Sequence, residues 1–215
     1  MKIDPIEFAG LLCSRLCHDL LSPVGAMGNG LELLADEKDP DVQAQCLTLL
    51  EDSARATANK LKYFRLAFGS GGSFGEAVST ADAREALAGL FPPSKRITLG
   101  WMVDVPMLAK PATKILLNLA AIAGDALLRG GQLDIGVEDQ AGRTEMVVRA
   151  SGERLMLDAE VRQTLLGLAD GEALSVRLAA AWLVRDLTRQ VGGDLRISEP
   201  EATTLVFGVL LPSPA

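Results

Sequence analysis

His18 is the only histidine of this 215-residue chain, and it is followed by Asp19 and, five positions on, by Pro23. An imidazole can serve as a general base, a metal ligand or a covalent nucleophile, so His18 is the first candidate for chemistry. The carboxylate of Asp19 can accept a hydrogen bond from the ring. No serine or cysteine identifies itself as a triad partner, so residue types alone leave these roles open.

In two stretches of the chain, mostly apolar residues recur at alternating steps of three and four. This spacing places them along one stripe of a helix, the seam at which packed helices meet. The first stretch runs through Cys17, Leu20, Val24, Met27, Leu31 and Leu34. The second runs through Leu47, Leu50, Ala54, Thr57, Leu61, Phe64 and Phe68. Between them, Asp39 and Pro40 are placed to cap and start the second helix, which predicts a helical hairpin. Two helices alone bury little apolar surface, so we expect the seam to close against a second copy in a dimeric four-helix bundle.

The seam also predicts the direction of His18. A helix turns about 100° per residue, so Leu16 and Leu20 each lie about 200° from His18 and the imidazole faces away from the core. The residues expected on this outer face, around the ring, are Leu11, Ser14, Arg15, Leu21, Ser22, Gly25 and Asn29. Most are small and leave the ring clear, while the two leucines add the exposed apolar area of a docking surface. Because Pro23 has no N–H, the carbonyl of Asp19 loses its helical donor, which predicts a bend after His18.

A Gly/Ser-rich stretch, GSGGSFG at 69–75, predicts a linker that divides the chain into domains 1–70 and 76–215. Beyond it, helices are expected near 80–90, 109–129, 158–168 and 173–191. Strands are expected at RITLGW, QLDIGVE, TEMVVRA, DLRIS and TTLVFGVLL. The predicted fold class is therefore α+β, with the hairpin followed by an α/β sandwich whose sheet is mostly antiparallel.

Composition narrows the class of partner. A net charge of −7, with two Trp and one Tyr, argues against a nucleic-acid binder, which needs a basic face and stacking aromatics. No apolar run reaches the roughly 18 residues of a membrane span, and MKIDPIEFAG lacks the features of a signal peptide, so a cytoplasmic location is expected. Cys13, Cys17 and Cys46 are predicted to be reduced, buried thiols, and no metal site is expected.

The stretch CHDLLSPVGAMGNGLELL resembles the phosphoacceptor box of sensor histidine kinases. In that box a histidine, an acid and, four residues after the acid, a proline lie on the first helix of a dimeric hairpin. The order of the elements downstream resembles the ATP-binding domain of the same kinases. The resemblance therefore covers nearly the whole chain.

The motifs that bind nucleotide in those kinases are degenerate in this chain. Asn118 is kept, but Ile122 stands where the kinase has the asparagine that holds magnesium. ASGERL keeps only Gly152 of the box Asp-x-Gly-x-Gly, with Ala150 and Arg154 at the other two places. The flexible glycines of the later phosphate-binding box are replaced, and without them the backbone cannot approach phosphates closely. The replacing residues are Val176, Leu178 and Ala180.

A phosphoacceptor hairpin joined to a degenerate kinase domain resembles the ChpT-type histidine phosphotransferases of alphaproteobacteria. The resemblance implies a homodimer in which His18 takes a phosphoryl group from the receiver domain of a CckA-like hybrid histidine kinase. It implies delivery to response regulators of the CtrA and CpdR type, with no ATP and no cofactor of the chain's own, because the receiver supplies Mg²⁺. Asp19 is expected to matter less than in a kinase, and Arg15 to help hold the phosphoryl group or to contact the partner. Two other functions stay open: an active histidine kinase with an unusual nucleotide site, and a non-catalytic dimeric scaffold for receiver domains.

Overall fold

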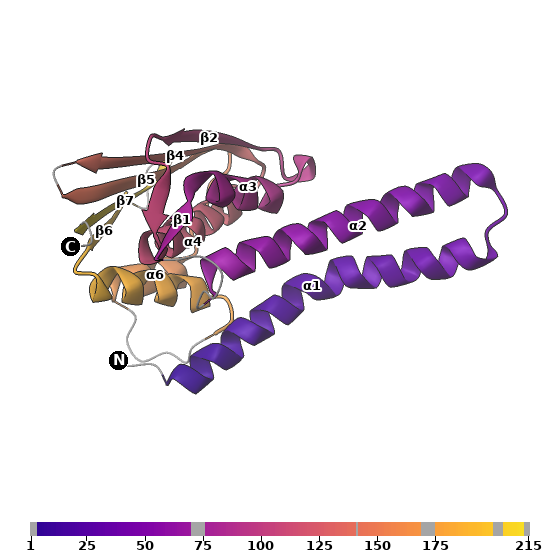
Figure 1. Cartoon of the computed structure of the whole chain (residues 1–215), viewed down its shortest axis with the longest axis horizontal. Coiled ribbons are helices and arrows are strands. Elements are labelled where there is room, and N and C mark those ends of the chain that lie inside the picture. Colours follow the sequence, from indigo (N-terminus) through magenta and orange to yellow (C-terminus); the bar gives the residue numbers. More distant parts are fainter. Residues whose placement is uncertain (1–3, 70–75, 141, 169–174, 200–203, 213–215) are drawn as a thin grey trace.

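The computed structural model describes residues 4–69, 76–140, 142–168, 175–199 and 204–212. Two long antiparallel helices, α1 (Pro5–Asp36) and α2 (Pro40–Ala67), form the predicted hairpin, whose turn projects away from an α/β domain (Figure 1). Asp39 caps α2 as predicted, since its carboxylate accepts the N–H of Asp41 at 2.9 Å. Throughout these ranges, no helix combines the length and the apolar character needed to cross a membrane.

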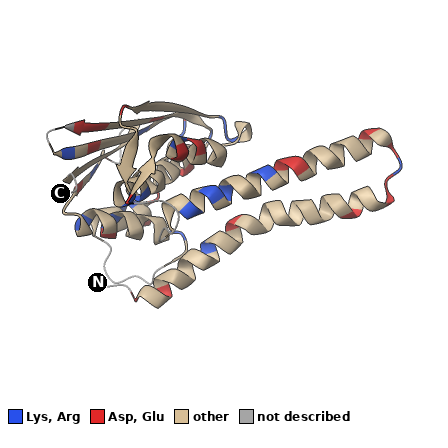
Figure 2. Ribbon diagram, viewed as in Figure 1, with Lys and Arg blue, Asp and Glu red and all other residues tan. Residues whose placement is uncertain are grey.

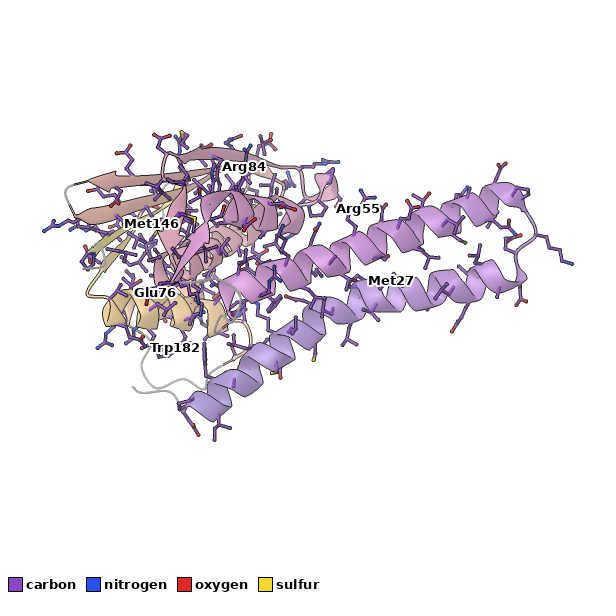
Figure 3. The ribbon with its side chains drawn as sticks, viewed as in Figure 1. Met27, Arg55, Glu76, Arg84, Met146 and Trp182 are labelled. Carbon is purple, nitrogen blue, oxygen red and sulfur yellow. The ribbon has the colours of Figure 1, made fainter. Side chains whose placement is uncertain are left out.

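The contact between α1 and α2 uses one side of the predicted seam. On α1, two lines at seven-residue spacing carry buried or half-buried residues, Leu16–Pro23–Gly30 and Leu20–Met27–Leu34, and Met27 lies between the two helices (Figure 3). On α2, the two corresponding lines are Cys46–Ser53–Lys60–Ala67 and Leu50–Thr57–Phe64. The predicted lines Leu20–Met27–Leu34 and Leu50–Thr57–Phe64 are therefore confirmed. The helices come close at Gly30, where an added Cβ would lie 3.2 Å from the side chain of Leu50.

The other half of the predicted seam is exposed in the single chain. On α1 it consists of Cys17, Val24 and Leu31, and on α2 of Leu47, Ala54 and Leu61. We call these six residues the open seam. Each helix of a hairpin has only one neighbour, which covers one side of a two-sided seam.

The cysteines differ from the prediction of three buried thiols. All three are free, and Cys46 is buried between the helices, but Cys13 and Cys17 are exposed. The prediction is wrong for these two because α2 does not cover the sides of α1 on which they lie.

The α/β domain contains two sheets. A small antiparallel pair joins β1 (Ala77–Ser79) to β3 (Met107–Ala109). The larger sheet has the order β2-β4-β5-β7-β6, and only β2 and β4 pair in parallel, so the prediction of a mostly antiparallel sheet is confirmed. Its strands are β2 (Ile97–Val103), β4 (Gly131–Gln140), β5 (Arg143–Ser151), β6 (Asp194–Ile197) and β7 (Thr204–Pro212).

Helices cover one face of the larger sheet (Figure 1), and β5 accordingly alternates exposed and buried residues. These helices are α3 (Thr80–Leu90), α4 (Lys110–Ala126), α5 (Ala159–Leu166) and α6 (Ala179–Gln190), with a 3-10 turn, η1 (Pro93–Lys95), before β2. All four were predicted. The expected start of the last helix, at 173, falls outside the described residues, as does 70–75 of the predicted linker.

One hydrophobic core joins the hairpin to the α/β domain. The last turns of α2 contribute Tyr63, Phe64, Leu66 and Ala67 to the core that α3 and α4 also line. The beginning of α1 packs against the same core through Phe8, and Trp182 of α6 is part of that core (Figure 3). The predicted units 1–70 and 76–215 thus share a core, which holds the His18 half of α1 beside the domain.

Candidate functional site

His18 lies on α1 with its side chain 85% exposed. Its Nδ1 is 3.4 Å from Oδ1 of Asp19, at the long end of a hydrogen bond. The outward direction predicted from the helix geometry is confirmed. The imidazole is therefore open to a partner on all sides except that of the adjacent carboxylate.

The residues predicted around His18 mostly share its exposure. Leu11 and Arg15 are half-buried, while Leu21 is 70% exposed. A Cβ added at Gly25 would meet no atom within 4 Å, so this part of the helix surface is open. We call the exposed set the His18 face: Ser14, His18, Leu21, Ser22, Gly25 and Asn29. Figure 2 shows that α1 carries few charged residues along this stretch, so the face is largely neutral.

Arg15 lies beneath this face. Its side chain is only 18% exposed, and Nε is 4.0 Å from Oδ2 of Asp19. The guanidinium carbon lies 5.7 Å from the centre of the Phe68 ring, a cation–π contact with the end of α2. Arg15 thus packs under the His18 turn, and its predicted roles toward the phosphoryl group or the partner stay predictions.

Pro23 is buried, and its effect on α1 extends to α2. The carbonyl of Asp19, which Pro23 leaves without a helical donor, accepts a hydrogen bond from Nζ of Lys60 at 2.5 Å. Figure 1 shows α1 changing direction near its middle, as Pro23 predicts. Sequence reasoning missed Lys60, although one signal was present: it lies seven residues after Ser53 and fourteen after Cys46, on the side of α2 that faces α1.

The two asparagine positions of the kinase motif that holds magnesium are packed inside this chain. Asn118 is fully buried, and its Nδ2 donates to the carbonyls of Ala67 at 3.1 Å and Lys114 at 2.8 Å. Ile122 packs against the core. Asn118 thus ties α4 to α2, and with the apolar Ile122 at the position of the kinase's magnesium ligand the pair does not fit a magnesium site. Among the described residues, no three His, Cys, Asp or Glu side chains group as metal ligands.

Of the positions that correspond to the kinase glycine boxes, most are packed as well, although Arg154 is exposed. Ala150, Leu178 and Ala180 are buried in the domain. A Cβ at Gly152 would lie 2.7 Å from the carbonyl oxygen of Gly130, so this glycine permits a close approach of two chain segments. These positions therefore lack the flexible glycines and the carboxylate that the kinase boxes carry.

Two polar atoms of the core, Oδ1 of Asn118 and the hydroxyl of Tyr63 on α2, are buried without a hydrogen-bond partner in the described part of the chain. Burial raises the pKa of Tyr63, and the positive charge of Arg15 opposes that rise. The phenol therefore stays neutral beneath the His18 turn.

Residues 80–203 match the family model of the histidine phosphotransferase C-terminal domain. The chain belongs to the histidine phosphotransferase family. It is 32% identical over 207 residues to the protein phosphotransferase ChpT of Brucella abortus (strain 2308), covering 96% of this chain and 97% of that one. A 1.7 Å structure of a bacterial phosphotransferase superposes with a TM-score of 0.85 at 28% identity, covering 97% of this chain and 98% of the other. This histidine phosphotransferase thus has the predicted α+β fold and the predicted activity, phosphoryl transfer through a phosphohistidine.

Proposed function

We propose that His18 is the phosphoacceptor of a multistep phosphorelay, taking a phosphoryl group from the aspartate of one receiver domain and passing it to that of another. The observation that carries this proposal is the 85% exposure of His18 on an open face of α1. Because the chain has a single histidine, a phosphohistidine can form only at this residue.

The ring geometry supports a direct transfer. With Nδ1 beside the Asp19 carboxylate, the Nδ1–H tautomer is favoured and the lone pair of Nε2 is left for in-line attack on phosphorus. The P–N bond forms as the P–O bond to the donor aspartate breaks and that aspartate leaves as a carboxylate. The phosphorylated ring keeps its proton on Nδ1, facing Asp19. Transfer to the next aspartate reverses these steps, so the chain mainly positions the ring.

The proposal assigns the metal to the partner. The receiver domain supplies Mg²⁺ and a cation for the phosphoryl oxygens, which agrees with a site on this chain made of one imidazole and small neutral residues. The proposed partners are the receiver domain of a CckA-like hybrid histidine kinase and response regulators of the CtrA and CpdR type. The similarity to a ChpT protein over nearly all of both chains supports this choice. A cytoplasmic location stays a prediction.

The chain is also proposed to work as a homodimer through the open seam. Val24 and Leu31, spaced by seven residues on α1, and Leu47 and Leu61 on α2 expose large apolar side chains along one side of the hairpin. A second hairpin would cover both lines and complete a four-helix bundle.

The decisive experiment mixes the protein with a receiver domain phosphorylated with ³²P on its aspartate. We expect the label on this chain, in an acid-labile, alkali-stable form typical of phosphohistidine. A parallel titration with ATP and Mg²⁺ should show no binding and no label. Label from ATP would establish the kinase alternative, and a stable complex without label would establish the scaffold.

Asp19→Asn should slow transfer without abolishing it. The amide oxygen can still accept from Nδ1 and hold the tautomer, but the negative charge that stabilises the phosphorylated ring is lost, which we expect to slow transfer roughly tenfold. Single-turnover rates measure the effect, and Asp36→Asn at the far end of α1 is the matched control. A loss as complete as that of His18→Ala would show instead that Asp19 is essential as a base.

Gly25→Gln should weaken receiver binding while leaving the fold intact. The new side chain enters open space and improves helix propensity by about 0.5–1 kcal/mol, so thermal stability should not fall. We expect the KM for the phosphorylated receiver to rise by roughly tenfold, a docking penalty of about 1.4 kcal/mol, with little change in kcat. Gly10→Gln, at an exposed glycine equally free of neighbours, is the control. An unchanged KM would place the docking surface elsewhere.

A further inference from the structure

Lys60 makes an unusual contact for a lysine at a helix interface. Its Nζ lies 2.5 Å from the carbonyl oxygen of Asp19, a main-chain atom of the residue next to His18. Within the described part of the chain, no carboxylate oxygen lies within 4.0 Å of this ammonium. The bond to the Asp19 carbonyl is thus the contact that compensates the partial burial of the charge.

The position of Lys60 on α2 makes this contact informative. Cys46, Ser53 and Ala67 lie on the same seven-residue line as Lys60, and all three are buried against α1 or the core. A lysine on such a line loses hydration that a small or apolar residue would not lose. A polar residue at one interior position of paired helices commonly fixes their register.

The sequence of α1 leaves the carbonyl oxygen of Asp19 without its usual helical donor. In an uninterrupted helix the N–H of residue 23 would donate to the carbonyl of residue 19. Pro23 has no N–H, so without another donor from the protein this partly buried carbonyl would lose its hydrogen bond. The α1 turn that carries His18 would then be joined to the rest of the helix with one hydrogen bond fewer.

We propose that Lys60 is a positioning residue for His18: its ammonium replaces the hydrogen bond that Pro23 removes and fixes the direction of the His18 turn relative to α2. This inference rests on the proposed role of His18. In-line transfer is sensitive to displacements of about 1 Å, so a loosened turn slows the reaction even when the partner still binds.

Four variants test the proposal in the full chain: Lys60→Met, Lys60→Arg, Pro23→Ala and Pro23→Ala combined with Lys60→Met. Lys60→Met keeps the stem but removes the donor, and we expect kcat for transfer from the phosphorylated receiver to fall about tenfold with KM within about twofold of wild type. Lys60→Arg should restore most of the rate. In the Pro23→Ala background, where residue 23 again has an N–H, Lys60→Met should change kcat by less than about twofold. Lys62→Met is the control, because Lys62 pairs with Glu85 of α3.

Thermal unfolding of the same variants separates this inference from the proposed function. We expect Lys60→Met to lower Tm by about 3–8 °C in the wild-type background and by clearly less in the Pro23→Ala background. If Lys60→Met fails to fold, Lys60→Gln takes its place in both backgrounds. A wild-type chain that accepts no phosphoryl group would refute the proposed function. The hydrogen bond from Lys60 to the Asp19 carbonyl would still be tested by Tm, through the difference between the effects of Lys60→Met in the two backgrounds. An unchanged kcat, a loss confined to KM, or equal effects of Lys60→Met in the two backgrounds would each overturn the positioning role.

Discussion

His18→Ala leaves the protein unable to accept a phosphoryl group from a phosphorylated receiver domain. The chain has no second histidine, and removal of the attacking nitrogen eliminates the covalent intermediate itself rather than one of its stabilising contacts. We expect no detectable label on the variant under conditions in which wild type is labelled within seconds to minutes. Autoradiography after mixing with the ³²P-labelled receiver measures this result.

The same substitution should leave the fold and the docking surface unaltered. The His18 side chain is 85% exposed and contacts the Asp19 carboxylate, so truncation should change the free energy of unfolding by no more than about 0.5 kcal/mol. His18→Ala should therefore still bind the receiver, which pull-down or calorimetry can confirm. Label on the variant would contradict the assignment of His18. If the variant lost both the label and receiver binding, the loss could come from chemistry or from docking. His18→Gln separates the two, because it restores the side-chain volume without the attacking nitrogen.

The direction of His18 could be predicted from sequence because it depends on local geometry. The rotation per residue of a helix and the positions of Leu16 and Leu20 are enough to place the imidazole outside. The strands of the larger sheet were predictable for a similar reason, since runs such as TEMVVRA and TTLVFGVLL are short segments rich in strand-forming residues. Both signals lie within a few residues of the feature they predict.

Features that depend on distant residues escaped prediction. Lys60 meets Asp19 across 41 positions of sequence, and no local pattern shows which interior lysine faces a carbonyl freed by proline. Arg15 was assigned to the outer face, yet the ring of Phe68 at the far end of α2 draws its guanidinium inward. The strands β1 and β3 are three residues each, and they form because Val78 pairs with Leu108. Such short segments carry too little periodicity to be recognised alone.

The seam illustrates a third situation, in which the sequence predicts a stripe of mostly apolar residues but not which side of it meets the same chain. Alternating steps of three and four describe a helix stripe with two sides. The line through Pro23 and Gly30 turned out to face α2, whereas the line through Val24 and Leu31 is exposed. A stripe this wide is typical of a helix with two helical neighbours.

Leu61→Glu should convert the protein from a dimer to a monomer. Val24, Leu31, Leu47 and Leu61 are each close to half or more exposed in the single chain. Burying such side chains contributes up to about 1.5–3 kcal/mol each, and eight of them across two copies can exceed an association penalty of about 4–15 kcal/mol. A carboxylate in the middle of that surface would have to lose its hydration without a partner, which opposes assembly strongly.

Light scattering after size-exclusion chromatography tests this expectation. Wild type should elute with about twice the 22.7 kDa of one chain, and Leu61→Glu with the mass of a single chain. Ser22→Glu adds the same charge to the His18 face, outside the open seam, and should remain dimeric. A monomeric wild type, or a Leu61→Glu variant that stays dimeric, would show that the open seam does not hold the copies together. Because His18 and the open seam lie on different sides of α1, the Leu61→Glu monomer also reveals whether one hairpin alone can accept a phosphoryl group.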